Sequence, residues 1–152
     1  MNRHLNVDVR AQKVFLMNGE NRLWQAPVST SQYGLSETPN SYCTPRGWHV
    51  ISEKIGDTAP LYAVFEARKW TGRVWDPENS RHSVDSILTR ILWLAGTEPH
   101  NQTTHARFIY FHGTPHEELI GQPASLGCIR LKNRDMLELY EQATVGMPVF
   151  IG

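Results

Sequence analysis

Residues 125–131 read Ser125-Leu126-Gly127-Cys128-Ile129-Arg130-Leu131, a short segment in which a glycine directly precedes a cysteine. Gly127 allows the backbone to turn sharply beside the sulfur, which would leave main-chain N–H groups facing a developing oxyanion. A thiol is a weak nucleophile at neutral pH until a base or a positive charge favours its thiolate. The segment therefore predicts either a reactive cysteine with a base nearby or a small side chain buried in a turn.

The candidate base is a histidine that lies sixteen positions upstream of this cysteine. His112 ends a β-rich run, Phe108-Ile109-Tyr110-Phe111, and is followed by glycines and prolines that suit a loop returning on itself. Such a loop would bring a base at a strand end beside a nucleophile in a glycine turn. The composition of the loop suggests this pairing but does not establish it.

The remaining sequence reads mainly as β-strands. Residues 5–31 resemble a β-meander in which Asn18-Gly19 supplies a hairpin turn. Residues 31–47, rich in Gly, Pro, Ser and Thr, predict a long loop that could form a wall or lid over a site. Residues 71–77 read as a turn. Further strand-like stretches cover residues 48–55, 61–67, 86–94, 107–112 and 147–151, of which 86–94 also fits a helical stripe.

One helix is expected, with Asn133 as its N-cap and Gly146 at its end. The sum predicts a mainly β fold, a sandwich or barrel-like domain with one clear helix after the cysteine. A chain of 152 residues is long enough for one core, so residues 1–152 are expected to form a single domain.

Composition excludes several classes of partner. Fifteen Lys and Arg residues balance fifteen Asp and Glu residues, so no net field favours nucleic acid or an anionic membrane. The sequence has no run of about 18 apolar residues, so no membrane insertion is expected. Residues 1–10 lack the apolar stretch of a signal peptide. These features predict a soluble cytoplasmic protein, or a periplasmic one if a leader has been removed. Nothing in the sequence indicates the oligomeric state.

Two alternative chemistries for Cys128 are weak. His112, His116 and Cys128 could suggest zinc, but the four-residue spacing converges only on a helix, which Pro115 disfavours. Cys128 and Arg134 have the spacing of a phosphatase loop, but no glycine lies between them to wrap a phosphate. No metal or organic cofactor is therefore expected. Cys43 reads as a small buried side chain rather than a disulfide partner. Five histidines have no evident partner: His4, His49, His82, His100 and His105.

Longer stretches resemble a known family. Tyr110-Phe111-His112-Gly113-Thr114, followed after a loop by Ser-Leu-Gly-Cys-Ile-Arg, resembles the signature of the L,D-transpeptidase (YkuD-like) catalytic domain. In the same order, Thr44-Pro45-Arg46-Gly47 resembles the family's Thr-Pro-x-Gly turn, and residues 146–151 fit its closing strand. One departure is Leu126, which stands where many members carry a second histidine.

The resemblance implies a role for each residue of the motif. Cys128 would be the nucleophile, His112 the general base and then acid, and the Gly113 carbonyl the group that orients the imidazole. The N–H groups of Gly127 and Cys128 would form the oxyanion hole. Two residues are candidates for substrate binding, with a structural role as the alternative for each, favoured in both cases: Ser125 and Arg130.

The substrates implied are peptidoglycan stem peptides or muropeptides, and carbapenems would acylate the same thiol. Cys128 would attack the carbonyl between the L centre of diaminopimelate and a terminal D-alanine. Resolution of the thioester by water makes the enzyme an L,D-carboxypeptidase, and resolution by a second stem's amine makes it a crosslinking transpeptidase. Because the sequence shows neither a leader nor a wall-binding module, we favour the carboxypeptidase in muropeptide recycling. A non-catalytic peptidoglycan-binding module is a further alternative.

Overall fold

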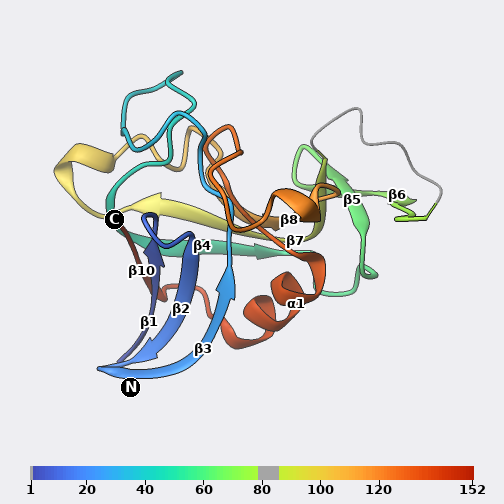
Figure 1. Ribbon diagram of the computed structural model, residues 1–152, viewed down its shortest axis with the longest axis horizontal. Coiled ribbons are helices and arrows are strands. Elements are labelled where there is room, and N and C mark those ends of the chain that lie inside the picture. The colour runs from blue at the N-terminus through green and yellow to red at the C-terminus, as the bar shows by residue number, and fades with distance from the viewer. Residues whose placement is uncertain (1, 79–85) are drawn as a thin grey trace.

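A computed structural model describes residues 2–78 and 86–152. Its described strands join into one sheet in the order β3-β2-β1-β10-β4-β7-β5-β6, with β8 paired to β7 and β9 paired to β8 (Figure 1). The strands are β1 (Arg3–Asp8), β2 (Lys13–Asn18), β3 (Asn21–Pro27), β4 (Gly47–Ile55), β5 (Ala63–Glu66), β6 (Lys69–Val74), β7 (Ile87–Gly96), β8 (Tyr110–Gly113), β9 (Ile129–Leu131) and β10 (Pro148–Ile151). The helical segments are α1 (Asn133–Gln142) and two 3-10 turns, η1 (Pro99–Asn101) and η2 (Glu117–Leu119).

The C-terminal strand closes the sheet. β10 pairs in parallel with β1 and antiparallel with β4, so it joins the N-terminal meander to the central strands. Its inward residues Val149 and Ile151 are fully buried beside Leu5 and Val7 of β1. Burial of this alternating set stabilises the junction, since each large apolar side chain contributes about 1.5–3 kcal/mol.

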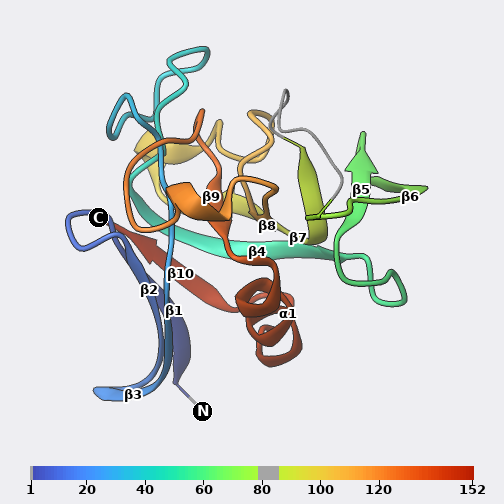
Figure 2. The same cartoon turned by 45° about the vertical axis from the view of Figure 1, so that its right-hand side comes forward.

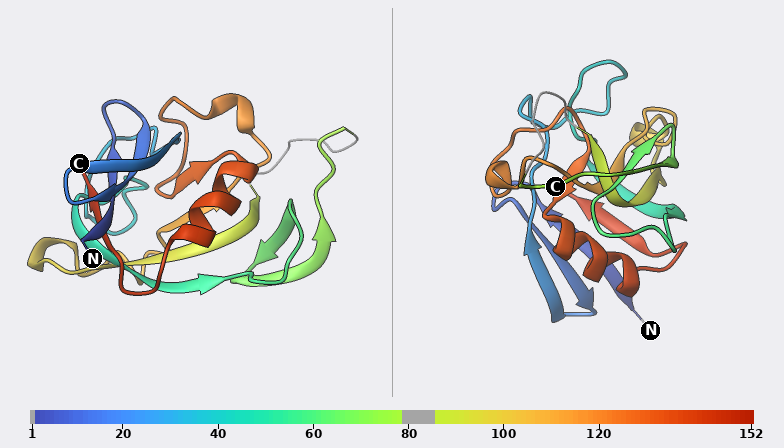
Figure 3. Two further views of the ribbon diagram at one scale, coloured as in Figure 1. Left: turned by 90° about the horizontal axis from the view of Figure 1, so that it is seen from below. Right: turned by 90° about the vertical axis from the view of Figure 1, so that its right-hand side faces the viewer.

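Helix α1 lies inside the curve of the sheet (Figure 3). Met136, Leu139 and Tyr140 follow a helical spacing and are buried in the main core, where α1 packs against β7 and β8. The helix thereby supports the strand that carries His112. Among the described residues, no helix is both long and apolar enough to cross a bilayer.

The predicted mainly β fold with one helix is confirmed, but some boundaries were wrong. The helix ends at Gln142 rather than near Gly146, and Lys132 rather than Asn133 is its N-cap. Residues 69–74 form strand β6 instead of the expected turn, because the chain already reverses at Ala67 and Arg68. The ambiguous 86–94 stretch is a strand, β7, and the short strand β9 was not anticipated. His82 lies outside the described residues.

A polar cluster fixes the long loop that residues 31–47 were predicted to form. His49, only 1% exposed, contacts the Gly47 carbonyl and the Thr104 hydroxyl through its two ring nitrogens. On the loop itself, Glu37 pairs with Arg46 at 2.9 Å, and the Arg46 guanidinium lowers the pKa of that carboxyl. The loop is therefore attached to the segment before β8.

We predict that His49 makes stability depend on pH. Burial lowers its pKa from 6.5 to about 4. Between pH 4 and pH 6.5 the unfolded chain therefore binds more protons than the folded one. The stability that the neutral, buried His49 contributes is present above this pH range and is lost as the pH falls through it. From pH 7 to pH 5 the loss should be about 2 kcal/mol. Chemical denaturation of the wild type and His49→Gln at both pH values measures it; equal pH slopes for the two proteins would contradict the assignment.

Candidate active site

Of the two residues predicted to react, His112 lies on β8 and Cys128 directly precedes β9, the parallel neighbour of β8 (Figure 2). β8 and β9 are aligned so that His112 pairs with Arg130, two positions after Cys128. The sequence separation of sixteen residues is thus closed by strand pairing.

Alternation along the strands puts both side chains on one face. Phe111 and Ile129, which are paired, enter the main core, whereas Tyr110 belongs to a second apolar cluster against which Cys128 packs. His112 follows Tyr110 by two positions, so it points to the same side as Tyr110 and Cys128. The main core therefore anchors one face of this strand pair, and His112 and Cys128 lie on the other face.

The imidazole of His112 is held in one tautomer. Its Nδ1 lies 2.6 Å from the Gly113 carbonyl oxygen. Because a carbonyl can only accept, Nδ1 must carry the proton, and Nε2 of the neutral ring is then the basic nitrogen. His112 is 3% exposed, so its orientation is fixed by packing as well as by this bond. The contact expected between His112 and Gly113 is present.

Two backbone groups position the sulfur of Cys128. The Tyr110 N–H donates to Cys128 Sγ at 3.4 Å, and the thiol donates to the Phe108 carbonyl, also at 3.4 Å. An N–H aimed at sulfur stabilises a thiolate once the proton leaves. Sequence reasoning missed both groups, because main-chain groups of the strand before His112 carry no residue-specific signal.

The turn before Cys128 is held by the hydroxyl of Ser125. That oxygen accepts from the Gly127 N–H at 3.2 Å and donates to the Cys128 carbonyl at 2.7 Å. Gly127 has φ +125°, which favours glycine, and packs near the Cys43 carbonyl. The Gly127 N–H predicted to face an oxyanion is thus engaged with Ser125 in this structure. A contribution from the Cys128 N–H stays a prediction.

Two predicted substrate-binding residues are buried. Ser125 is 1% exposed and Arg130 is 2% exposed. Arg130 Nη2 lies 3.5 Å from Ser29 Oγ, and the backbones of these two residues form an isolated antiparallel bridge. The geometry gives both residues a structural role, as favoured for them above. Substrate contact by either would require the side chain to move and stays a prediction.

A buried amide supports the strand that carries His112. The Asn133 side chain accepts from the Thr89 hydroxyl at 2.7 Å and donates to the Thr114 carbonyl at 2.8 Å. Asn133 is therefore not the predicted N-cap: its own N–H donates to the Glu117 carboxylate at 2.8 Å. A Cβ placed at Gly113 would overlap Asn133 Oδ1, so the close approach requires glycine there. This network links β7, β8 and α1 behind the imidazole.

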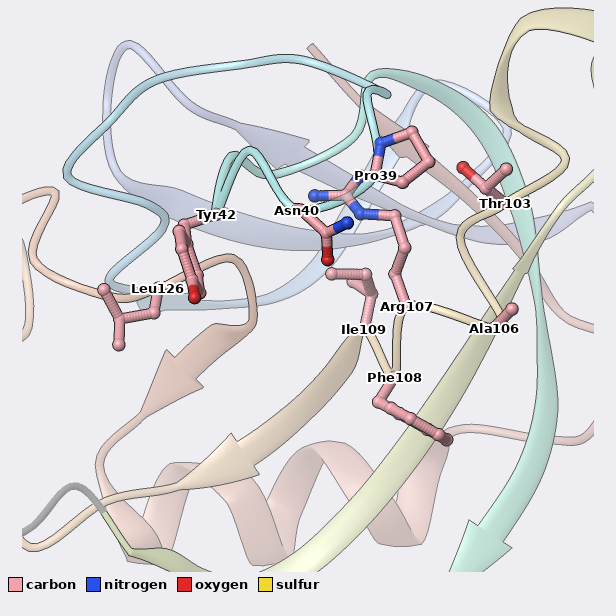
Figure 4. A pocket seen from close by; sticks show the side chains of 9 residues that line it. All are labelled: Pro39, Asn40, Tyr42, Thr103, Ala106, Arg107, Phe108, Ile109 and Leu126. Atoms are coloured by element: carbon pink, nitrogen blue, oxygen red, sulfur yellow. The ribbon is translucent and has the colours of Figure 1, made fainter.

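A cavity of about 370 Å³ is lined in part by Phe108, whose carbonyl accepts a hydrogen bond from the Cys128 thiol (Figure 4). The long loop and the segment before β8 form its walls, and Leu126, from the turn before Cys128, lines it at one end. Arg107 stands in its middle and donates to the carbonyls of Ser36 at 3.2 Å and Cys43 at 2.6 Å. Burial lowers the pKa of Arg107, while the thiols of Cys43 and Cys128 act in the opposite direction. This arginine therefore holds the loop and lies within electrostatic reach of both sulfurs.

The other residues singled out by sequence lie elsewhere or act structurally. Cys43 forms no disulfide, and its thiol donates to the Tyr33 carbonyl at 3.4 Å. His116 lies 3.6 Å from Glu118. His100 contacts Glu37 and Glu98, His105 stacks on Trp93, and His4 packs on Trp48. Among the described residues, no three His, Cys, Asp or Glu side chains are grouped as metal ligands would be.

Comparison with known families agrees with this arrangement. The model of the L,D-transpeptidase catalytic domain (YkuD) matches residues 2–151. The chain therefore belongs to the L,D-transpeptidase catalytic domain family. A search of curated proteins found no match to the sequence.

Solved structures show the same fold at low sequence identity. An L,D-transpeptidase from Xylanimonas cellulosilytica is 14% identical, with a TM-score of 0.65, and the alignment covers 100% of this chain and 61% of that one. An L,D-transpeptidase from Mycobacterium smegmatis is 17% identical, with a TM-score of 0.61, and the alignment covers 99% of this chain and 58% of that one. L,D-transpeptidase 3 from Mycobacterium tuberculosis, in complex with a faropenem-derived adduct, is 17% identical, with a TM-score of 0.59. That alignment covers 99% of this chain and 60% of the other. The chain thus spans about three fifths of the length of these proteins.

We predict that Asn133→Ala lowers the stability of the protein. The change leaves the Thr114 carbonyl and the Thr89 hydroxyl without their amide partner inside the protein, which should reduce the free energy of unfolding by about 2–4 kcal/mol. The neighbouring Arg134→Ala, on the exposed face of α1, is the control and should change it by about 0.5 kcal/mol or less. Urea denaturation measures both, and equal effects would show that the network does not support the site.

Proposed function

We propose that this protein is a cysteine acyl-transfer enzyme that removes the terminal D-alanine from peptidoglycan tetrapeptides, with water as the acyl acceptor. The observation that carries the proposal is the placement of His112, fixed by the Gly113 carbonyl, beside Cys128 on one face of the β8–β9 pair. Family membership supports peptidoglycan stem peptides as the substrate class.

The first half-reaction forms a thioester. His112 Nε2 takes the thiol proton, and Cys128 Sγ attacks the carbonyl between the L centre of diaminopimelate and D-alanine. The Tyr110 N–H, at 3.4 Å, stabilises the sulfur as its charge grows. The tetrahedral intermediate collapses with loss of D-alanine, whose nitrogen receives the proton from His112. The tripeptide is then held on Cys128 as an acyl group.

The second half-reaction decides the type of enzyme. Water attacks the thioester, His112 takes a proton from that water, and the thiol leaves as the tripeptide is released. Cys128 is partly exposed, which supports access of water. The cavity of about 370 Å³ that Phe108 and Leu126 help to line is at the small end of ligand pockets and suits the end of one stem peptide. A transpeptidase must instead hold a second stem against the thioester to gain effective molarity over water.

We predict that His112 activates Cys128 and leaves Cys43 unaffected. In wild-type protein at pH 7, iodoacetamide should label Cys128 faster than Cys43. His112→Gln should slow labelling of Cys128 by about 10-fold, because the thiol loses the base that would take its proton. Peptide mapping by mass spectrometry measures both rates, with His100→Gln as the control histidine variant. Equal labelling of the two cysteines in the wild type would favour a non-catalytic binding module.

We predict that the purified protein converts a disaccharide tetrapeptide to the tripeptide and free D-alanine. Donor and acceptor stems at equal concentration should give little crosslinked dimer, and Cys128→Ala should abolish D-alanine release while Cys43→Ala retains most of it. Mass spectrometry of the products distinguishes the two acceptors, which share one thioester. A predominance of dimer would replace the carboxypeptidase by the crosslinking transpeptidase.

A further inference from the structure

An arginine distant in sequence from the motif residues contacts Phe108 and Tyr110, the two residues whose backbones hold the Cys128 sulfur. Arg68 occupies the turn between β5 and β6, where Glu66 pairs with Lys69. Its guanidinium lies 5.1 Å from the centre of the Trp93 ring and 5.0 Å from that of Phe108. It also donates to the Tyr110 hydroxyl at 3.4 Å. The two aromatic rings hold the planar group in place and leave its edge available.

The residues that hold Arg68 are the same ones that hold the sulfur. The Phe108 carbonyl accepts a hydrogen bond from the Cys128 thiol, and the Tyr110 N–H donates one to Sγ. Burial raises the pKa of Tyr110, with the nearby Arg68 lowering it and Cys128 raising it, as expected if all three lie close together. Phe108 and Tyr110 therefore each contact both the Arg68 side chain and the sulfur of Cys128.

The backbone is strained where it presents these groups. Ala67 and Arg68 have φ values of +49° and +65°, a turn conformation that favours Asn and Gly. Phe108, which is 49% exposed, has φ +58°, which is unusual for an aromatic residue. Strained backbone is frequent at ligand-binding sites, where the surrounding structure maintains it. Here the strained Arg68 contacts the strained Phe108, whose carbonyl accepts a hydrogen bond from the Cys128 thiol.

The charge of Arg68 has no acidic partner in the described part of the chain. The ion pairs found there involve other cations, including Arg73 with Glu66 on the same hairpin at 2.6 Å. A guanidinium bound by rings and one neutral hydroxyl can still accept a planar carboxylate with two parallel hydrogen bonds. The substrate class proposed above carries carboxylates close to its scissile bond.

We propose that Arg68 binds a carboxylate of the stem peptide and so determines substrate specificity. This inference rests on the proposed function. Two carboxylates have this chemistry: the terminal one of D-alanine and the one on the side chain of diaminopimelate. The first lies on the leaving group, and the second stays on the acyl group after D-alanine departs.

Kinetics on three substrates test the proposal. The natural disaccharide tetrapeptide is compared with one ending in D-alaninamide, which lacks the terminal carboxylate, and with one carrying L-lysine, which lacks the side-chain carboxylate. Arg68→Met keeps the aliphatic contact with the rings but removes the charge. It should lower kcat/KM on the natural peptide by about 10- to 100-fold. On the peptide that lacks the bound carboxylate, the same substitution should change kcat/KM less than twofold.

Two controls separate this role from a structural one. Arg73→Met removes an exposed cation from the same hairpin and should leave kcat/KM within twofold on all three peptides. Arg68→Lys keeps the charge and should restore part of the preference for the natural peptide. Thermal unfolding of each variant shows that it is folded. Equal losses on all three peptides, or no loss on any, would overturn the role of Arg68. Failure of the wild type to cleave the last residue from any of the three peptides would instead refute the proposed function.

Discussion

The parallel pairing of β8 with β9 is the contact on which the site depends. Three aligned residue pairs, led by Phe111 with Ile129, bring a strand end and a glycine turn together across sixteen positions of sequence. Phe111 and Ile129 are fully buried, so apolar burial on one face fixes the register of the other. A slip of one residue would exchange the faces and place His112 in the core. The reactive pair therefore depends on packing that itself does no chemistry.

Strained backbone and buried polar contacts around this strand pair both help to hold His112 and Cys128 in position. Thr89, a β-branched residue with φ +75°, adopts a conformation that costs about 1–2 kcal/mol. That backbone places its hydroxyl on Asn133, which in turn holds the Thr114 carbonyl two residues after His112. On the other side of the sulfur, Phe108 turns its carbonyl to Cys128 through another left-handed residue. Rigid support of this kind fixes the imidazole and the thiol before substrate arrives.

The sequence predicted the mainly β fold and the hairpin at Asn18-Gly19, because these depend on local patterns. The pairing of His112 with Cys128, which follows from the motif, stays a prediction. It did not predict Arg68 or the role of Asn133, because both act through contacts with residues far away in the chain. The turn at Ala67 and Arg68 lacks the Asn or Gly that usually marks such turns, so β6 was read as a turn. The oxyanion donor assigned to Gly127 followed from the motif alone, and the Ser125 hydroxyl engages it here.

The central claim is that Cys128, positioned by β8 and β9, is the residue that becomes acylated. Intact-protein mass spectrometry after incubation with a carbapenem tests it most directly, because the strained ring carbonyl traps the thiolate as a stable thioester. The account predicts one adduct, mapped to Cys128 and absent from Cys128→Ala. Protein that stays unmodified at saturating carbapenem while its thiol still titrates, or an adduct mapped to Cys43, would contradict it.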